Sequence, residues 1–161
     1  MIRLTGDQRD VGGVALGAIW IGDSADEQVA DLVSANVGAI LNVAQDMLST
    51  RGWWHGVEAM HVGLVDGPGN EQSAYCAAVL ALHALLKRHN TLVCCHTGGR
   101  SLAVAIMFLN LGIADTWREW GDWLDILQER VDADLPAVNE VHAQVFDAML
   151  WSPLAAILGG K

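Results

Sequence analysis

Cysteine is scarce in this sequence, with three residues in 161, and two of the three are adjacent. Three cysteines do not make the disulfide framework of a small secreted protein, and they suit a reducing compartment. The amino-terminal residues Arg3, Asp7 and Arg9 interrupt any apolar core that a signal peptide would need. We therefore expect a cytoplasmic protein.

Basic residues are also few: nine Lys and Arg face 19 Asp and Glu, for a formal net charge of −10. This balance argues against nucleic acid or an anionic membrane surface as the main partner. No apolar run reaches the roughly 20 residues that a membrane span needs. We expect no nucleic-acid partner and no membrane partner, and the oligomeric state stays unknown.

Hydrophobic residues make up 52% of the chain, which is typical of a globular protein with a substantial core. The length fits a single domain over residues 1–161, with a core at about 12–151. Apolar runs at Val14–Ile21, Val37–Val43, Met60–Val65 and Thr91–Val93 read as strands. Helical patterns at Ala25–Ala35, Glu71–His89, Ser101–Leu111, Thr116–Arg130 and Val138–Trp151 alternate with or follow them. The order predicts an α/β fold whose central, mostly parallel, twisted sheet is flanked by helices.

The segment from Thr91 to Ser101 carries the strongest functional signal. A strand-like run ends in Cys94 and Cys95, a short loop follows, and Arg100 stands at the start of a helix. Backbone N–H groups of such a loop converge on one point, where the helix dipole adds positive potential. A cysteine there favours the thiolate, and an arginine can grip two oxygens of one anion. Nucleophile, anion cradle and clamp together indicate covalent phosphoryl transfer to sulfur.

These residues resemble the signature loop of the cysteine-dependent protein tyrosine phosphatase superfamily, and the chain looks most like its small dual-specificity phosphatases. That signature is a cysteine, five residues, an arginine and then serine or threonine, and Cys94 to Ser101 has this spacing. The order of other fragments also matches, including Ile19–Gly22 and Gly38–Val43. The resemblance implies a tyrosine phosphatase-like fold and a phosphatase that needs no metal and no cofactor.

Two cysteines compete for the role of nucleophile. Counted from Cys94 the loop has the family's length, but Thr97 stands where the family has glycine. Counted from Cys95, Gly98 falls in the glycine position, but only four residues precede Arg100. Loop length decides how the arginine folds over the phosphate, so Cys94 is slightly favoured and Cys95 stays open.

The other catalytic candidates follow from the chemistry. Asp66 precedes a Gly-Pro-Gly loop and would protonate the leaving oxygen and then activate water; the resemblance implies the same role. Ser101 would hydrogen-bond the cysteine sulfur. The predicted phosphate cradle consists of Cys95, His96, Thr97, Gly98, Gly99 and Arg100. His61 and His142 lie in apolar sequence and are predicted to be core or rim histidines rather than catalytic ones.

The resulting hypothesis is a phosphatase that hydrolyses phosphate monoesters, with a phosphorylated protein as substrate and phosphocysteine as intermediate. One alternative is a catalytically inactive domain that binds phosphate or acts as a scaffold, because the loop is irregular in either register. A rhodanese-like sulfur transferase also carries a cysteine loop after a strand. Arg100, Ser101 and Asp66 argue against that third possibility.

Overall fold

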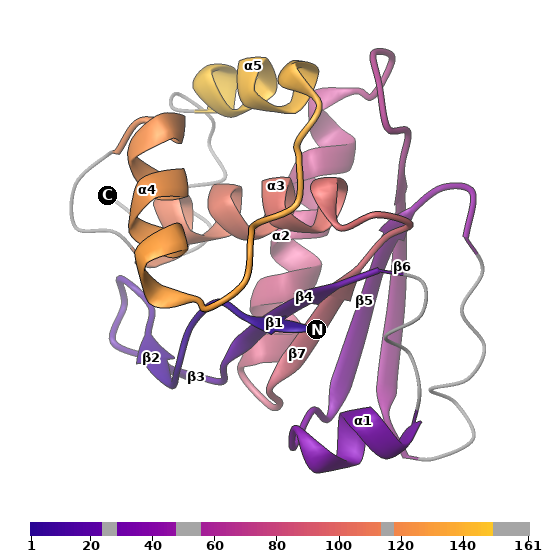
Figure 1. The fold of residues 1–161 in the computed structure, drawn as a ribbon, viewed down its shortest axis with the longest axis vertical. Helices are drawn as coiled ribbons and strands as arrows, with labels where there is room; N and C mark the ends of the chain where they lie inside the picture. The colour runs from indigo at the N-terminus through magenta and orange to yellow at the C-terminus, as the bar shows by residue number, and fades with distance from the viewer. Residues whose placement is uncertain (24–28, 48–55, 114–117, 150–161) are drawn as a thin grey trace.

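The computed structural model describes residues 1–23, 29–47, 56–113 and 118–149. A five-stranded sheet forms its centre, in the order β1 (Ile2–Arg3), β4 (Ile19–Gly22), β7 (Thr91–Cys94), β5 (Ala39–Ala44) and β6 (Glu58–Leu64). Strands β4, β7, β5 and β6 run parallel, and β1 pairs antiparallel with β4 (Figure 1). The predicted α/β fold with a mostly parallel sheet is confirmed.

The inner strands are apolar because they are covered on both faces. Every residue of β5 and of β7 is buried, as expected for parallel strands between helices. β6 lies at the edge of the sheet, and all its residues except the buried Leu64 are exposed or part-buried. Two further strands, β2 (Gln8–Arg9) and β3 (Ala15–Leu16), form a separate antiparallel pair.

Helix α3 (Gly99–Phe108) is buried at every residue, continues as a π-helical segment at Leu109–Ile113, and contacts β4, β5 and β7. Helix α2 (Gln72–Leu86) packs beside α3 and contacts β5, β6 and β7. Helices α4 (Trp120–Arg130) and α5 (Glu140–Ala148) contact each other, and α5 also contacts α3. Helix α1 (Val29–Ser34) lies at the end of the molecule opposite α5 (Figure 1). No helix within these ranges is long and apolar enough to cross a membrane.

One predicted strand is wrong. The run Val14–Ile21 is not a single strand but splits into β3 and β4 around Gly17. There the Gly17 N–H donates to the Leu86 carbonyl (2.8 Å), and a Cβ at Gly17 would lie 2.5 Å from the carbonyl oxygen of His89. The chain therefore leaves the sheet to pass closely over the end of α2, a contact that only glycine permits.

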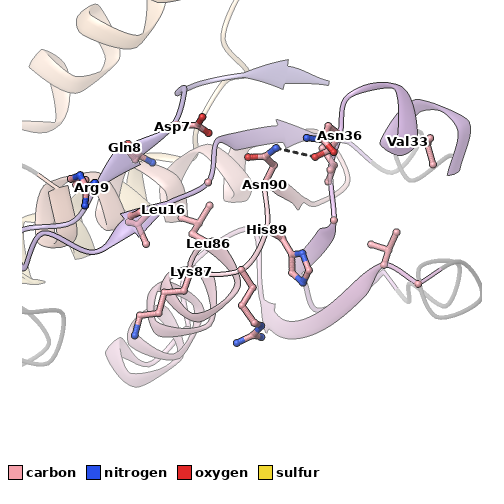
Figure 2. A pocket seen from close by; sticks show the side chains of 17 residues that line it. Asp7, Gln8, Arg9, Leu16, Val33, Asn36, Leu86, Lys87, His89 and Asn90 are labelled. Carbon is pink, nitrogen blue, oxygen red and sulfur yellow. Dashed lines mark hydrogen bonds between the residues drawn. The ribbon is translucent and has the colours of Figure 1, made fainter.

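The two edges of the parallel sheet differ in what they carry. At the edge where the strands begin, a cavity of about 830 Å³ is lined in part by Arg9, Asn36, His89 and Asn90 (Figure 2). None of the predicted catalytic residues lines it. At the opposite edge, Gly22, Cys94 and Asn42 are in register at the carboxyl ends of neighbouring strands. Ligand sites of open α/β sheets lie outside these carboxyl ends, and the predicted loop follows β7 there.

Candidate active site

The predicted loop connects β7 to α3 through residues 95–98. Gly98 has φ +90°, a left-handed conformation that glycine adopts without steric cost, and its carbonyl accepts from the Leu102 N–H (2.9 Å). A Cβ at Gly98 would lie 3.0 Å from the ring of Pro136, and one at Gly99 would lie 2.5 Å from the Ala137 carbonyl oxygen. Gly98 therefore permits the left-handed turn, and both glycines let the segment before α5 pack closely against the start of α3.

The sulfur inside this loop belongs to Cys95. Its Sγ accepts from the backbone N–H of Gly98 (3.1 Å) and lies 3.4 Å from the backbone nitrogen of Ser101, which also donates to it. Two backbone N–H groups and the start of α3 thus face this one sulfur.

Cys94 has a different position. It is the last residue of β7, is fully buried, and pairs in the sheet with Gly22 and Asn42. The Cys95 N–H continues this ladder by donating to the Gly22 carbonyl (3.3 Å). Since successive side chains of extended backbone point to opposite sides, the two sulfurs face different surroundings. These contacts favour Cys95 as the nucleophile, with four residues between it and Arg100. The loop length had slightly favoured Cys94.

Ser101 lies beside the Cys95 sulfur but does not use its hydroxyl as expected. Its backbone N–H makes the contact with Sγ, while its Oγ is buried and has no hydrogen-bond partner in the described part of the chain. An unpaired buried hydroxyl is costly. A charged sulfur or a bound oxyanion would provide the acceptor that it lacks.

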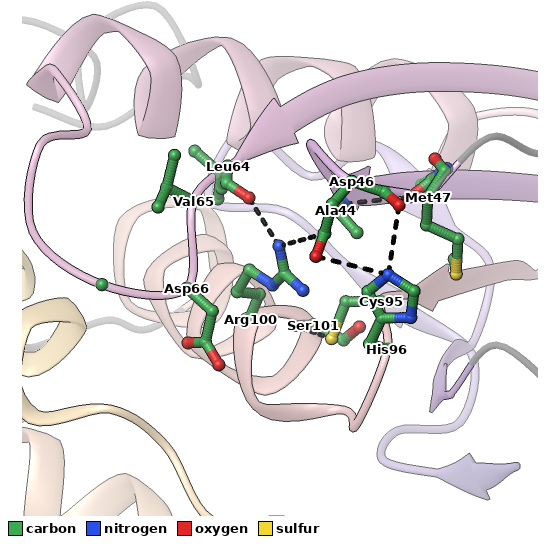
Figure 3. A network of polar contacts seen from close by, with 12 residues as sticks. Ala44, Asp46, Met47, Leu64, Val65, Asp66, Cys95, His96, Arg100 and Ser101 are labelled. Atoms are coloured by element: carbon green, nitrogen blue, oxygen red, sulfur yellow. Dashed lines mark hydrogen bonds and ion pairs between the residues drawn. The ribbon is translucent and has the colours of Figure 1, made fainter.

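Arg100 is almost completely buried, with 4% of its surface exposed. Its Nη1 donates to the Leu64 carbonyl oxygen (2.7 Å) at the end of β6 and to Oδ1 of Asp46 (3.0 Å), as Figure 3 shows. Both protons of Nη1 are thereby used. Nε and Nη2 carry the remaining donors of the guanidinium fork.

Asp46 is a functional candidate that the sequence analysis missed. It follows β5 and reaches both Arg100 and His96, whose Nε2 lies 3.4 Å from its Oδ2 and 3.2 Å from its carbonyl oxygen (Figure 3). The hydrogen bond from Arg100 holds the pKa of the Asp46 carboxyl below its ordinary value, although partial desolvation opposes the shift. The available signal was an acidic residue just past the strand that neighbours β7, at the same edge of the sheet.

The remaining cradle residues, His96 and Thr97, are exposed at the loop. Thr97 and Gly98 line a small cavity of about 230 Å³ together with Gly22, Asp134 and Pro136. His96 is held to the turn after β5 by its contacts with Asp46.

Asp66 lies just after β6, two residues beyond the Leu64 carbonyl that anchors Arg100. Asn70 organises its loop, since the Asn70 side chain accepts from the Val65 N–H (2.8 Å) and donates to the Val65 carbonyl (2.8 Å). The Asp66 carboxyl is 46% exposed, and its Oδ1 lies 3.1 Å from Nε2 of His142 in α5. In the view of Figure 3, Asp66 and Asp46 lie on opposite sides of Arg100.

The site therefore combines a sulfur facing N–H donors, a buried arginine and a half-exposed carboxyl on the loop after β6. Such a set can bind an oxyanion and exchange a proton with a group near it. Among the described residues, no cluster of three or more His, Cys, Asp or Glu side chains could hold a metal ion.

Neither a protein-family model nor a curated protein matches the sequence. Solved structures do match. DUSP15 has a TM-score of 0.67 at 18% identity, with 96% of this chain and 95% of that chain covered. The Yvh1 phosphatase domain from Chaetomium thermophilum has a TM-score of 0.68 at 15% identity, with 92% and 95% covered. The core catalytic domain of the PP-IP phosphatase SIW14 from S. cerevisiae has a TM-score of 0.66 at 12% identity, with 97% and 94% covered. The chain has the fold of the dual-specificity phosphatase-like cysteine phosphatases, and the predicted resemblance is confirmed at the level of the fold.

Proposed function

We propose that this protein is a cysteine-dependent phosphatase that hydrolyses phosphate monoesters through a phosphocysteine at Cys95. The observation that carries the proposal is the Cys95 sulfur, which faces the N–H groups of Gly98 and Ser101 at the start of the helix that holds Arg100. This is the arrangement that a nucleophilic thiolate and an incoming oxyanion both require.

In the first step, Sγ of Cys95 attacks phosphorus while the bond from phosphorus to the leaving oxygen breaks. Arg100 binds two phosphate oxygens through Nε and Nη2, since Nη1 is held by Leu64 and Asp46. Asp66 gives its proton to the leaving oxygen, so the alcohol or phenol departs neutral.

In the second step, the Asp66 carboxylate takes a proton from water, and the water oxygen attacks the phosphocysteine. The sulfur–phosphorus bond breaks, inorganic phosphate leaves, and the thiolate is restored. The Ser101 hydroxyl, which has no hydrogen-bond partner within the described residues, can then donate to the departing sulfur. A stabilised thiolate is the better leaving group in this step.

A phosphorylated protein is the proposed substrate. Near the loop, Arg100 and His96 both contact the carboxyl of Asp46, and Asp134 lines the small cavity beside Thr97 and Gly98. Such a balance suits a single phosphate better than a ligand that carries many. Among the similar structures, Yvh1 is described as a phosphatase domain, whereas SIW14 is described as a PP-IP phosphatase.

The second candidate is a domain that binds phosphate without turning it over. Two observations favour it. The Asp46 carboxylate already accepts a hydrogen bond from one nitrogen of Arg100, and the loop has only four residues between Cys95 and Arg100. Fewer loop residues offer fewer N–H donors to the phosphate.

Hydrolysis of a small aryl phosphate by the wild type, Cys95→Ser, Cys94→Ser and Arg100→Lys tests the proposal. We expect turnover by the wild type and by Cys94→Ser, none by Cys95→Ser, and a loss on the order of 100-fold for Arg100→Lys because the fork is lost. Circular dichroism checks that each variant is folded. A folded wild type that binds phosphate but releases none from the ester would favour the binding domain instead.

A further inference from the structure

His142 links the proposed general acid to the protein core. It lies in α5, its ring is fully buried, and its two nitrogens contact Asp66 Oδ1 (Nε2, 3.1 Å) and the Tyr75 hydroxyl (Nδ1, 2.6 Å). Tyr75 belongs to the first turn of α2, and its ring meets His142 edge-on with centroids 5.8 Å apart. Asn70, from the loop that also carries Asp66, donates to the same hydroxyl (3.2 Å).

Asn70, Tyr75, His142 and Asp66 form a series of hydrogen bonds, and the direction of each bond follows from the orientation of the Asn70 side chain. The Asn70 amide is oriented by Val65, whose N–H it accepts and whose carbonyl it donates to, so Nδ2 is the atom that faces Tyr75. The Tyr75 hydroxyl accepts from Asn70, and the acceptor that the described residues offer for its own proton is Nδ1 of His142. Burial raises the pKa of Tyr75, so the hydroxyl keeps that proton.

His142 Nδ1 is therefore an acceptor, and the ring proton lies on Nε2, where it is donated to Oδ1 of Asp66. In a protonated carboxyl the C=O oxygen is the stronger acceptor, so the oxygen that accepts this N–H is the less suited of the two to carry the acid proton. The second oxygen, Oδ2, is left to do so on a carboxyl that is 46% exposed.

We propose that His142 is a positioning residue for the general acid: it fixes Oδ1 of Asp66, so that Oδ2 carries the proton passed to the leaving group. The inference rests on the proposed phosphatase function and on Asp66 as its acid. It assigns to a buried helix residue, 76 positions from Asp66 in the chain, a part in the chemistry that goes beyond packing.

The test compares the wild type, Asp66→Asn, His142→Asn and His142→Gln on a series of aryl phosphates, from acidic nitrophenols to phenol as leaving groups. Proton donation matters for poor leaving groups and little for good ones. We expect kcat/KM of Asp66→Asn to fall on the order of 100-fold for phenyl phosphate and about twofold for the most acidic leaving group. His142→Asn should fall about tenfold and about twofold at the same two ends.

His142→Gln provides the matched control, because its amide N–H can reach a carboxyl much as Nε2 does. We expect it to recover most of the loss with phenyl phosphate. An equal loss of kcat/KM across the whole series in His142→Asn, or no loss at all, would overturn the positioning role and leave His142 as a packing residue.

A second measurement uses the wild-type protein alone, so it does not depend on whether any variant folds. The ¹⁵N shifts of the His142 ring in the wild-type protein should show a protonated Nε2 and an unprotonated Nδ1 near neutral pH. The opposite tautomer would refute the hydrogen-bond chain. If instead the wild type releases no phosphate, or Asp66→Asn shows no dependence on the leaving group, the failure lies in the proposed function and takes this inference with it.

Discussion

Replacing Gly99 with alanine is expected to destabilise the protein and damage the candidate site together. Gly99 is the first residue of α3, and an alanine Cβ there would lie 2.5 Å from the backbone oxygen of Ala137. A backbone oxygen cannot rotate away as a long side chain can. Either the start of α3 or the segment before α5 must move.

The size of the effect follows from this overlap. Overpacking a tight contact costs about 1–3 kcal/mol. For a chain of this length, the melting temperature changes by about 2–4 °C for each kcal/mol. We therefore expect Gly99→Ala to melt roughly 2–12 °C below the wild type. Because Arg100 is the next residue, kcat/KM should also fall by about tenfold or more.

Gly121→Ala is the matched control, since Gly121 lies in the first turn of α4 and, beyond its chain neighbours and its own helix backbone, no heavy atom of the described residues lies within 4 Å of its added Cβ. Alanine there lowers the entropy of the unfolded chain and favours the helix, so the melting temperature should rise by about 1–4 °C. Thermal denaturation followed by circular dichroism measures both variants. A Gly99→Ala protein as stable and as active as the wild type would refute the close approach of the two segments.

Three further changes test other parts of the structure. Asp46→Asn removes the negative charge beside Arg100 but keeps a hydrogen-bond acceptor there. Inorganic phosphate should therefore inhibit the variant about three- to tenfold more tightly at low salt, with a smaller gain at high salt. An unchanged inhibition constant at low salt would contradict this. The pKa of Asp10 is lowered in the fold: burial opposes the shift, and the hydrogen bonds from His83 and two backbone N–H groups outweigh it. A lowered pKa gives the fold extra stability above the unfolded pKa near 4, and this stability is lost as the pH falls through the folded pKa. The difference in melting temperature between the wild type and Asp10→Asn should therefore be largest at about pH 6 and shrink in acid. A difference that grows in acid would contradict this sign. Asn42→Ala removes a buried side chain that accepts from the Ala44 N–H and donates to the Met47 carbonyl, on either side of the turn after β5. It should lower the free energy of unfolding by about 1–3 kcal/mol in urea titrations, and an unchanged free energy of unfolding would contradict these two hydrogen bonds.

Much of the sheet could be predicted because its strands are short, buried and apolar. Val37–Val43 and Thr91–Val93 were expected as strands, and β5 and β7 occupy nearly these positions. β1 and β2 have two residues each, too few to show any periodicity. The predicted start of the fourth helix at Thr116 and the end of the fifth at Trp151 lie outside the described residues.

The candidate site was predicted where its residues are local in the chain. The loop from Cys95 to Ser101 and the start of α3 are contiguous, so their composition carries the signal. The competition between the two cysteines depends on where β7 ends, which the sequence pattern leaves uncertain by a residue or two.

The distant members of the site could not be found in this way. Asp46 and Arg100 are 54 positions apart, and their meeting depends on the pairing of β5 with β7. His142 was expected to be a core or rim residue, and it is fully buried, but its bond to Asp66 spans two elements whose packing no local pattern specifies. His61, by contrast, is exposed on the edge strand β6, and its Nε2 lies 2.7 Å from the Ala44 carbonyl oxygen.

The central claim is that Cys95 carries the phosphoryl group, and trapping that intermediate tests it most directly. The wild type and the Cys94→Ser and Cys95→Ser variants would be mixed with an aryl phosphate, quenched in acid within milliseconds, digested and examined by mass spectrometry. The account predicts one phosphoryl group on Cys95 in the wild type and in Cys94→Ser, and no phosphocysteine in Cys95→Ser. A phosphoryl group on Cys94, or hydrolysis that continues in Cys95→Ser, would contradict it.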